Sequence, residues 1–220
     1  MNNLKFPQLI SASLLILTLA NIANAAPITY TGSKGQYTAS TNKPTIPEVK
    51  YGLITDKCIG SACLGMTFGQ LKAKLGNKVK YKAGQFMVDI DAVRVIQDGK
   101  VQYEICYGAG EKLRDKDKIT CLSTTNSYYR TKEGVGPGTS LIQAQKIYGR
   151  ATVSNRADNE SREVLSFSKL PSGYQRIWFR PESKSSHDFA GIYADWGKEY
   201  NQTNRFKPDA YIRQVMINKE

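Results

Sequence analysis

The chain has 220 residues, of which 40% are hydrophobic and 23% are charged, and this composition excludes collagen-like and low-complexity proteins. Its only histidine, His187, excludes a histidine-rich metal site, and any Ser-His-Asp or Cys-His catalytic centre would depend on that one side chain. The formal net charge of +12 indicates an acidic partner, either a protein or an anionic component of the cell envelope, rather than nucleic acid outside the cell.

The first 25 residues are predicted to be a signal peptide. Lys5 supplies a positive charge, residues 9–19 form an apolar run, and Ala23-Asn24-Ala25 has the small residues of a cleavage site. The run is shorter than the ~20 residues that a helix needs to cross a bilayer, and no later segment is long and apolar enough. We therefore expect cleavage near Ala25 and a periplasmic or secreted protein without a transmembrane span. Since Lys5 is the only charged residue removed, the mature chain keeps a net charge of +11.

A helix signature occurs twice, at an offset of 73 residues. LGMTFGQLKAKLG begins at Leu64, and PGTSLIQAQKIYG begins at Pro137. In each segment an S/T-x-x-Q capping box opens a short amphipathic helix, apolar residues recur on one side, and a glycine ends the helix. The capping and ending residues are Thr67 with Gly76, and Ser140 with Gly149.

Strand signals follow each of these helices. In the first half, residues 86–96 and 100–107 flank Asp98-Gly99, which is a strong signal for a hairpin turn. In the second half, turn residues separate four strand candidates, at residues 162–168, 174–180, 189–194 and 211–217. A short helix followed by antiparallel strands, twice over, predicts an α+β fold with the helices on one face of the sheet. The other face is then free to meet solvent or a partner.

These signals divide the chain into four parts. The signal peptide, residues 1–25, is followed by residues 26–49, which are polar, contain three prolines and are predicted to be a linker or a loosely attached arm. Residues 50–133 and 134–220 are predicted to be two tandem repeats, each a short helix, or two, packed on an antiparallel β-meander.

The four cysteines are predicted to form two disulfides, because an exported chain meets an oxidising compartment. If the strand-like segments on either side of the loop at residues 108–118 pair antiparallel, Cys106 lies opposite Cys121. Cys58 and Cys63 then close a short loop before the first helix. Neither pair has the C-x-x-C spacing of a thiol oxidoreductase, so both are expected to be structural.

The helix signature G-x-T/S-Φ-x-Q-Φ-x(3)-Φ-G, followed by a three- or four-stranded meander, resembles the repeat of the β-lactamase inhibitory protein. It also resembles the single domain of the SmpA/OmlA-type outer-membrane assembly lipoproteins. The resemblance covers the two motifs and the order of elements over most of residues 50–220, and from the inhibitor it implies binding through a concave sheet and inserted loop tips. Unlike the assembly lipoproteins, this chain has no cysteine for lipid attachment and has two units. Segments within residues 134–163 are also similar to secreted bacterial proteins of unassigned activity.

Aromatic residues provide the first candidate surface, because interfaces are enriched in Tyr, Trp and Arg. In the strand predicted over residues 174–180, alternation places Tyr174, Arg176 and Trp178 on one side and the residues between them on the other. If the intervening residues form the core, Trp178 with Arg176 is an exposed anchor for a partner, and if they do not, the anchor is lost. Trp196 is a further candidate.

A run of lysines without an intervening acid provides the second candidate surface. It has two interpretations, a binding patch for an acidic partner, or the solvated face of a helix and the turn that follows it. The lysines are Lys72, Lys74, Lys78, Lys80 and Lys82.

Two functions from different classes fit these features. The first is an exported, non-enzymatic binding module, either an inhibitor of a partner protein or an adaptor in the cell envelope, that uses an aromatic sheet face and positive charge. The alternative is a hydrolase of cell-wall or other polymers that uses carboxylates near Glu160 and Glu163, whose pKa values burial would have to push apart. We favour the first, and expect no catalytic residue, no metal and no cofactor.

Overall fold

The computed structural model describes residues 29–32, 35–38, 52–185, 189–194 and 198–219. The predicted signal peptide, His187 and Trp196 lie outside these residues. The chain divides into two units, Met1–Val49 and Lys50–Glu220, so the second unit begins where the sequence predicts the linker to end. Among the described residues, no helix has the length and apolar character needed to cross a membrane.

The region predicted to be a linker contains a small hairpin. Its strands, β1 (Thr29–Gly32) and β2 (Gly35–Thr38), pair antiparallel, with Tyr30 opposite Tyr37. Thr and Tyr favour extended backbone. The sequence does not predict this hairpin, because the prolines and the polar composition of the whole segment favour a linker.

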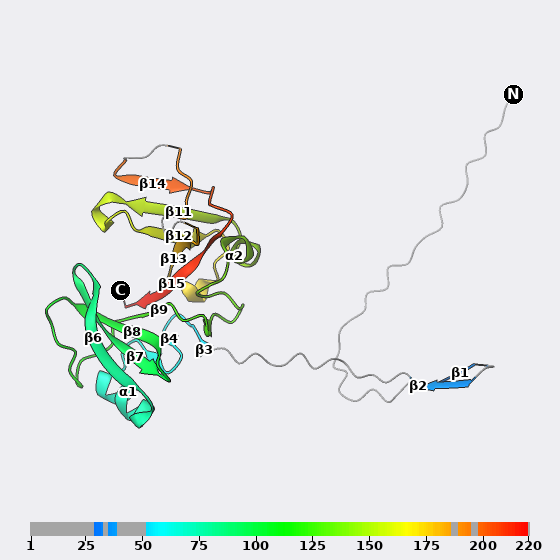
Figure 1. Cartoon of the computed structure of the whole chain (residues 1–220), viewed down its shortest axis with the longest axis horizontal. Coiled ribbons are helices and arrows are strands. Elements are labelled where there is room, and N and C mark those ends of the chain that lie inside the picture. The colour runs from blue at the N-terminus through cyan, green and yellow to red at the C-terminus, as the bar shows by residue number, and fades with distance from the viewer. Residues whose placement is uncertain (1–28, 33–34, 39–51, 186–188, 195–197, 220) are drawn as a thin grey trace. The chain divides into compact units, whose positions relative to one another are not determined.

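The second unit is built on one antiparallel sheet of nine strands, in the order β14-β11-β12-β13-β15-β9-β8-β7-β6 (Figure 1). The fold is therefore mostly β with a few short helices. The strands are β6 (Lys80–Met87), β7 (Ile90–Gln97), β8 (Lys100–Gly108), β9 (Cys121–Thr124), β11 (Ala151–Arg156), β12 (Glu163–Phe167), β13 (Ile177–Ser183), β14 (Tyr200–Thr203) and β15 (Ala210–Asn218). Two small pairs lie outside this sheet: β3 (Gly52–Leu53) with β10 (Tyr129–Arg130), and β4 (Cys58–Ile59) with β5 (Ala62–Cys63).

Two α-helices of eight residues, α1 (Phe68–Leu75) and α2 (Leu141–Tyr148), begin directly after the predicted capping residues. At α1 both hydrogen bonds of the capping box form, from Gln70 N–H to Thr67 Oγ1 and from Thr67 N–H to Gln70 Oε1. At α2 the hydrogen bond to the Ser140 hydroxyl forms. Glycines with positive φ end both helices, as predicted. Short 3₁₀ helices occur at η1 (Gly76–Lys78), η2 (Ala157–Asn159) and η3 (Ser172–Tyr174).

The helices cover one face of the sheet, which we call the inner face. The buried side chains of α1 and α2 belong to the same apolar cluster as the alternate residues of the strands. Successive cross-strand partners in this cluster, from β7 to β13, are Val93, Ile105, Leu122, Ile217 and Ile177. Period-two alternation therefore leaves the intervening side chains on the opposite, outer face.

Several strand boundaries differ from those predicted. Residues 86–96 are not one strand, because β6 ends at Met87 and the chain turns before β7. The segment at residues 189–194 forms only an isolated bridge, and the loop that follows it contains β14. By contrast, the hairpin turn at Asp98-Gly99 is confirmed, since both residues have the positive φ that such a turn requires.

The cysteines pair as the sequence predicts. Cys106 of β8 and Cys121 of β9 are direct cross-strand partners and form a disulfide, with their Cα atoms 5.1 Å apart. Cys58 and Cys63 form the second disulfide within the β4–β5 hairpin. The Cys106–Cys121 bridge lies on the outer face, because Cys121 is next to Leu122 in the alternation of β9 and Leu122 is on the inner face.

Candidate functional site

The outer face is curled into a groove. Successive cross-strand partners along this face, from β7 to β13, are Arg94, Glu104, Ser123, Met216 and Trp178. At the two sides of the groove, the sulfur of Met87 in β6 lies 3.2 Å from Nη1 of Arg162, next to β12. Five strands separate β6 from β12 in the sheet, so this contact requires a strong bend toward the outer face.

Two β-bulges bring consecutive side chains into the groove. In β15 the register shifts opposite Arg180, so that Arg213 and Gln214 both line it. In β6 a second shift places Phe86 beside Met87 in the same lining. A bulge inserts one residue and redirects its side chain, and bulges are common beside functional sites. The groove therefore presents more side chains than regular alternation would supply.

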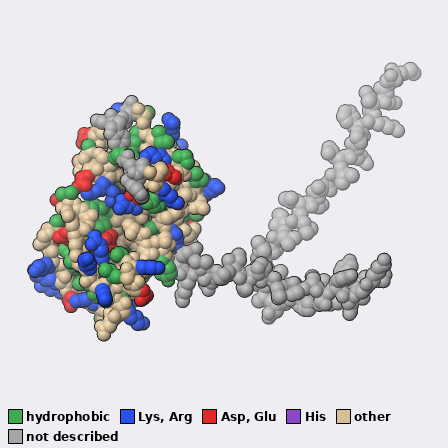
Figure 2. All heavy atoms as spheres, viewed as in Figure 1, with side chains coloured by type: hydrophobic (Ala, Val, Ile, Leu, Met, Phe, Trp, Pro, Cys, Tyr) green, Lys and Arg blue, Asp and Glu red, His purple; other side chains and the backbone are tan. Residues whose placement is uncertain are grey.

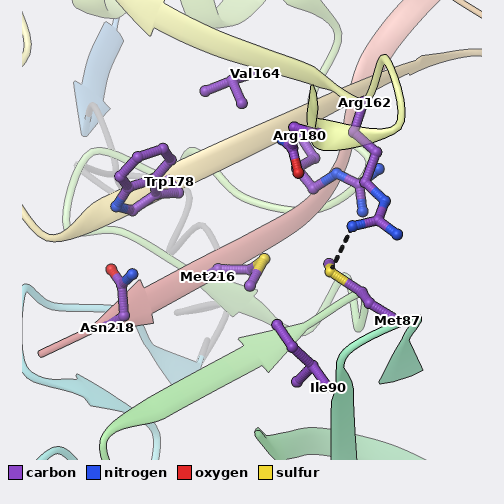
Figure 3. A pocket seen from close by; sticks show the side chains of 9 residues that line it. Met87, Ile90, Arg162, Val164, Trp178, Arg180, Met216 and Asn218 are labelled. Atoms are coloured by element: carbon purple, nitrogen blue, oxygen red, sulfur yellow. Dashed lines mark hydrogen bonds between the residues drawn. The ribbon is translucent and has the colours of Figure 1, made fainter. Parts of the chain in front are cut away.

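One half of the groove is an apolar hollow of about 200 Å³. In Figure 3, Trp178, Met216 and Val164 lie on one side of it, and Arg162 and Arg180 lie on the other. The Trp178 side chain is 48% exposed although it projects from a central region of the sheet. The remaining lining residues are Met87, Ile90, Asn159 and Asn218.

The other half is a polar hollow of about 410 Å³ lined by four arginines and a single carboxylate, Glu104. Nε of Arg94 donates to Oε1 of Glu104 at 3.1 Å. Burial raises the pKa of Glu104 even though the Arg94 guanidinium acts to lower it. The arginines are Arg94, Arg162, Arg180 and Arg213.

Two of these arginines pair with acids outside the lining. Arg162 forms an ion pair with Glu160, and Nη1 of Arg213 lies 2.9 Å from Oε1 of Glu182. Arg180 differs, because no carboxylate among the described residues lies within ion-pair distance of it.

Arg180 has no carboxylate in direct contact, although Glu182 and Glu160 act on it from a longer distance. Its Nη1 donates to Oε1 of Gln214 at 3.3 Å, and the Gln214 amide in turn donates to the Ser123 hydroxyl at 2.8 Å. Its Nε is buried and has no hydrogen-bond partner. Burial, together with the neighbouring Arg162 and Arg213 guanidiniums, lowers the pKa of Arg180. The groove thus contains a desolvated cation with unused hydrogen-bonding capacity.

A strained turn carries Arg162 to the groove. Glu160 and Ser161 both have φ of 52°, a left-handed conformation that non-glycine residues seldom adopt. Two hydrogen bonds close the turn, from Ser161 N–H to the carbonyl of Arg156 and from Arg162 N–H to the carbonyl of Asn159. Such strain persists only where surrounding contacts enforce it and is concentrated at functional sites.

Of the aromatic candidates that lie within the described residues, only Trp178 lines the groove. The neighbouring Ile177 is buried in the core, which is the condition under which Trp178 is expected to be exposed. The strand begins at Ile177 and not at Tyr174, because the preceding turn forms η3, and Tyr174 is buried with its hydroxyl donating to Glu133 at 2.8 Å. Arg176 binds Asp56 through its backbone N–H and Nη1, at 2.7 and 2.8 Å. Trp196 lies outside the described residues.

The lysine run is divided among three elements. Lys72 pairs with Asp115 and Lys74 donates to the Ser61 carbonyl, both from α1, while Lys78 is exposed in η1. The interpretation as the solvated face of a helix and turn therefore fits only the first three lysines, because Lys80 and Lys82 lie on the edge strand β6. Lys82 is the cross-strand partner of Arg94, so it adds positive charge beside the groove, and Lys80 shares its face. Figure 2 shows basic side chains spread over much of the visible face.

The carboxylates considered for hydrolysis have separate roles in the structure. Glu163 is buried and accepts hydrogen bonds from the N–H groups of Ala190 and Gly191 and from the Tyr193 hydroxyl, at 2.5, 2.8 and 2.7 Å. Glu160 is exposed and pairs with Arg162. Among the described residues, no group of three or more acids, cysteines or histidines could hold a metal ion.

Sequence reasoning missed the arginines that line the groove. One signal was available, since Arg180 follows Trp178 by two residues and therefore shares its face. A second signal was the interruption of apolar alternation in β15 by the consecutive pair Arg213-Gln214, which is typical of a bulge. The approach of Met87 and Arg162 depends on the curvature of the sheet and had no signal in the sequence.

Comparison with known proteins gives a structural likeness without a function. No family model and no curated protein matches this chain. Among solved structures, the chain is similar to the uncharacterized protein yfeY from Escherichia coli, with a TM-score of 0.46 and 14% sequence identity. The likeness covers 76% of this chain and 99% of that one.

Proposed function

We propose that this chain is an exported, non-enzymatic binding module that holds an acidic partner protein in the groove of the outer face. One observation carries the proposal: an exposed tryptophan and an apolar hollow lie directly beside arginines whose charge the surrounding acids do not fully balance. Trp and Arg are the residues that most often supply binding energy at protein interfaces. Apolar burial supplies affinity, and the arginines select an acidic partner.

The net charge of the chain supports an acidic partner. The excess of 11 basic residues in the mature chain creates a long-range attraction, and Lys80 and Lys82 extend the positive field of the groove to the edge strand. An inhibitor of an acidic enzyme or an adaptor in the cell envelope would both use such a surface.

The order of elements supports the two predicted repeats. Each helix starts after a capping hydroxyl and is followed by strands that pair in sequence, β6 to β9 in the first half and β11 to β13 in the second. β15 completes the second set and pairs with β9, so the two sets share one sheet. In this proposal the repeats are 50–133 and 134–220, and their junction forms the floor of the groove.

Two features support export. The predicted signal peptide precedes the compact unit, and the compact unit contains two disulfides, which persist in oxidising compartments. The alternative function, polymer hydrolysis by Glu160 and Glu163, has less support, because three hydrogen bonds already occupy the buried Glu163 carboxylate.

The proposal is tested by cross-linking capture from an envelope extract of the source organism with the purified, disulfide-bonded protein. Trp178→Ala is compared with Ile147→Ala, which removes an equally exposed apolar side chain from α2 on the helix-covered side. We expect an acidic protein that the wild type and Ile147→Ala retain, and that Trp178→Ala loses by at least ~10-fold, as for an interface hot spot. Retention should fall at high salt.

Two results would overturn the proposal. One is a partner retained equally by wild type and Trp178→Ala. The other is the absence of any retained protein together with hydrolysis of wall polymer that Glu160→Gln abolishes.

A further inference from the structure

We infer that the four arginines of the groove form a receptor for a carboxylate of the partner, with Arg180 as its central donor. The inference rests on the proposed function and specifies the chemistry of its ligand. The carboxylate belongs to an Asp or Glu side chain of the partner, and an apolar side chain next to it in the partner enters the hollow beside Trp178.

The charges around the polar hollow leave room for one more anion. Its lining contains four guanidiniums and one carboxylate, and the acids that pair with Arg162 and Arg213 lie outside that lining. Arg94 is engaged by Glu104. Arg180 alone receives only a neutral acceptor, the Gln214 side chain, at 3.3 Å. A carboxylate in the hollow would supply the missing negative charge.

The geometry of Arg180 is suited to such a ligand. Arg180 lines both hollows, and a guanidinium fork can bind both oxygens of a carboxylate. The Ser123–Gln214–Arg180 series of hydrogen bonds fixes the fork in place before the ligand arrives. Preorganised donors lose less entropy on binding.

The arrangement of arginines in the groove disfavours folding. Arg180 is partly desolvated beside two other guanidiniums, and burial together with that repulsion destabilises its charged form. An apolar side chain of similar length would avoid this cost, because replacing a buried charge with a well-packed apolar group is often neutral or stabilising. The strained turn at Glu160 and Ser161, which delivers Arg162, adds a second cost. Both costs are explained if the ligand requires these groups.

The position of Arg180 also defines what accompanies the carboxylate. Met87, Arg162 and Arg180 line both hollows, so the two are contiguous. A segment whose carboxylate reaches Arg180 places its neighbouring side chain against Trp178 and Met216. The ligand is therefore an acidic residue next to a bulky apolar residue, and not an isolated anion.

The probe for this site is the peptide acetyl-Phe-Asp-Phe-Asp-amide, compared with acetyl-Phe-Asn-Phe-Asn-amide and with inorganic phosphate. Binding is followed by NMR through the arginine side-chain Nε–H signals, which report the unpartnered Arg180 Nε directly. We expect the acidic peptide to shift the Arg180 signal and to bind at least ~10-fold more tightly than the amide peptide, as expected for a charge-assisted pair. Phosphate alone should bind more weakly than the acidic peptide, because it lacks the apolar contact.

Arg180→Met is the decisive variant, and Arg150→Met is its matched control. Arg150 is exposed between α2 and β11 and lines neither hollow, so its substitution removes the same charge elsewhere. Arg180→Met should weaken binding of the acidic peptide by ~10-fold or more. It should also raise the midpoint of thermal unfolding by ~2 °C or more, whereas an arginine with a structural role would lower it. Arg150→Met should change neither quantity.

The inference is overturned if both peptides bind equally, if phosphate competes fully and binds more tightly than the acidic peptide, or if Arg180→Met binds like wild type. It is also overturned if Arg180→Met lowers the unfolding midpoint. These outcomes are separate from failure of the proposed function, which depends on Trp178. If the protein retains its partner through Trp178 and Arg180→Met has no effect, the binding module stands and the carboxylate receptor does not.

Discussion

The two faces of the nine-stranded sheet are made by alternate residues of the same strands, yet they carry different kinds of side chain. On the inner face, large apolar side chains stand directly opposite one another and pack against α1 and α2. On the outer face, arginines, a tryptophan and a methionine occupy the equivalent positions. The inner face needs only apolar groups of the correct volume. The outer face instead contains groups that disfavour folding, such as the partly desolvated Arg180.

The largest effect should come from a pair of adjacent aromatic residues. Phe179 is 1% exposed and packs against Phe167 and Tyr148, with ring centroids 5.6 and 6.3 Å away, whereas Trp178 faces the groove. Phe179→Ala should lower the free energy of unfolding by about 3–5 kcal/mol, because it leaves a cavity in the core. Trp178→Ala should lower it by only about 1 kcal/mol. Urea unfolding of both variants measures the contrast, and equal losses would show that the two faces contribute alike to stability.

The next effect concerns the covalent link on the outer face. Removing the Cys106–Cys121 disulfide with Cys106→Ala and Cys121→Ala should cost about 3 kcal/mol on the chain-entropy account, given its sequence separation of 15. The Cys58–Cys63 bridge has a separation of 5, and its removal should cost about 2 kcal/mol. Urea unfolding of the two double variants provides the measurement. A larger loss at Cys58–Cys63 would contradict this order.

The smallest effects should come from two carboxylates, Glu133 and Glu104, whose contributions to the free energy of unfolding depend on pH in opposite directions. Partial burial acts to raise the pKa of Glu133, but hydrogen bonds from the Tyr174 and Tyr148 hydroxyls outweigh it and lower the pKa below 4.5. Burial raises the pKa of Glu104 above 4.5. Glu133 therefore contributes stability above pH 4.5 that is lost as the pH falls through its lowered pKa. Glu104 causes a loss of stability as the pH rises from 4.5 through its raised pKa.

Unfolding free energies of Glu133→Gln and Glu104→Gln between pH 3 and pH 7 test these signs. Glu133→Gln should flatten the acid side of the profile, and Glu104→Gln should flatten the decline above pH 4.5. If either substitution leaves its side of the profile unchanged, the corresponding carboxylate does not titrate as the hydrogen bonds and burial require.

The sequence predicted the features that depend on local chemistry. A hydroxyl, a glutamine three residues later and a terminal glycine placed α1 and α2 correctly, because caps act within one turn. The Asp98-Gly99 turn placed the β7–β8 hairpin, and the strand signals on either side of the loop at residues 108–118 placed Cys106 opposite Cys121.

The features that the sequence did not predict depend on contacts between distant residues. β6 was hidden because its lysines continue the basic run of α1, although charged residues are expected on an edge strand. Tyr174 alternates correctly with Trp178, but the preceding turn forms a 3₁₀ helix and carries it into the core. The groove itself needs curvature and two bulges, which bring together Met87 of β6, Arg162 next to β12 and Arg213 of β15.

The position of β15 has a consequence for the order in which the molecule can be completed. Among the described strands β15 (Ala210–Asn218) comes last in the chain, yet it occupies the middle of the sheet between β13 and β9. Until β15 has paired, β9 and β13 each keep an open edge, and the remaining strands form two separate sheets of four. A chain truncated before Ala210 would therefore lack the outer-face groove and would divide the second unit at its centre.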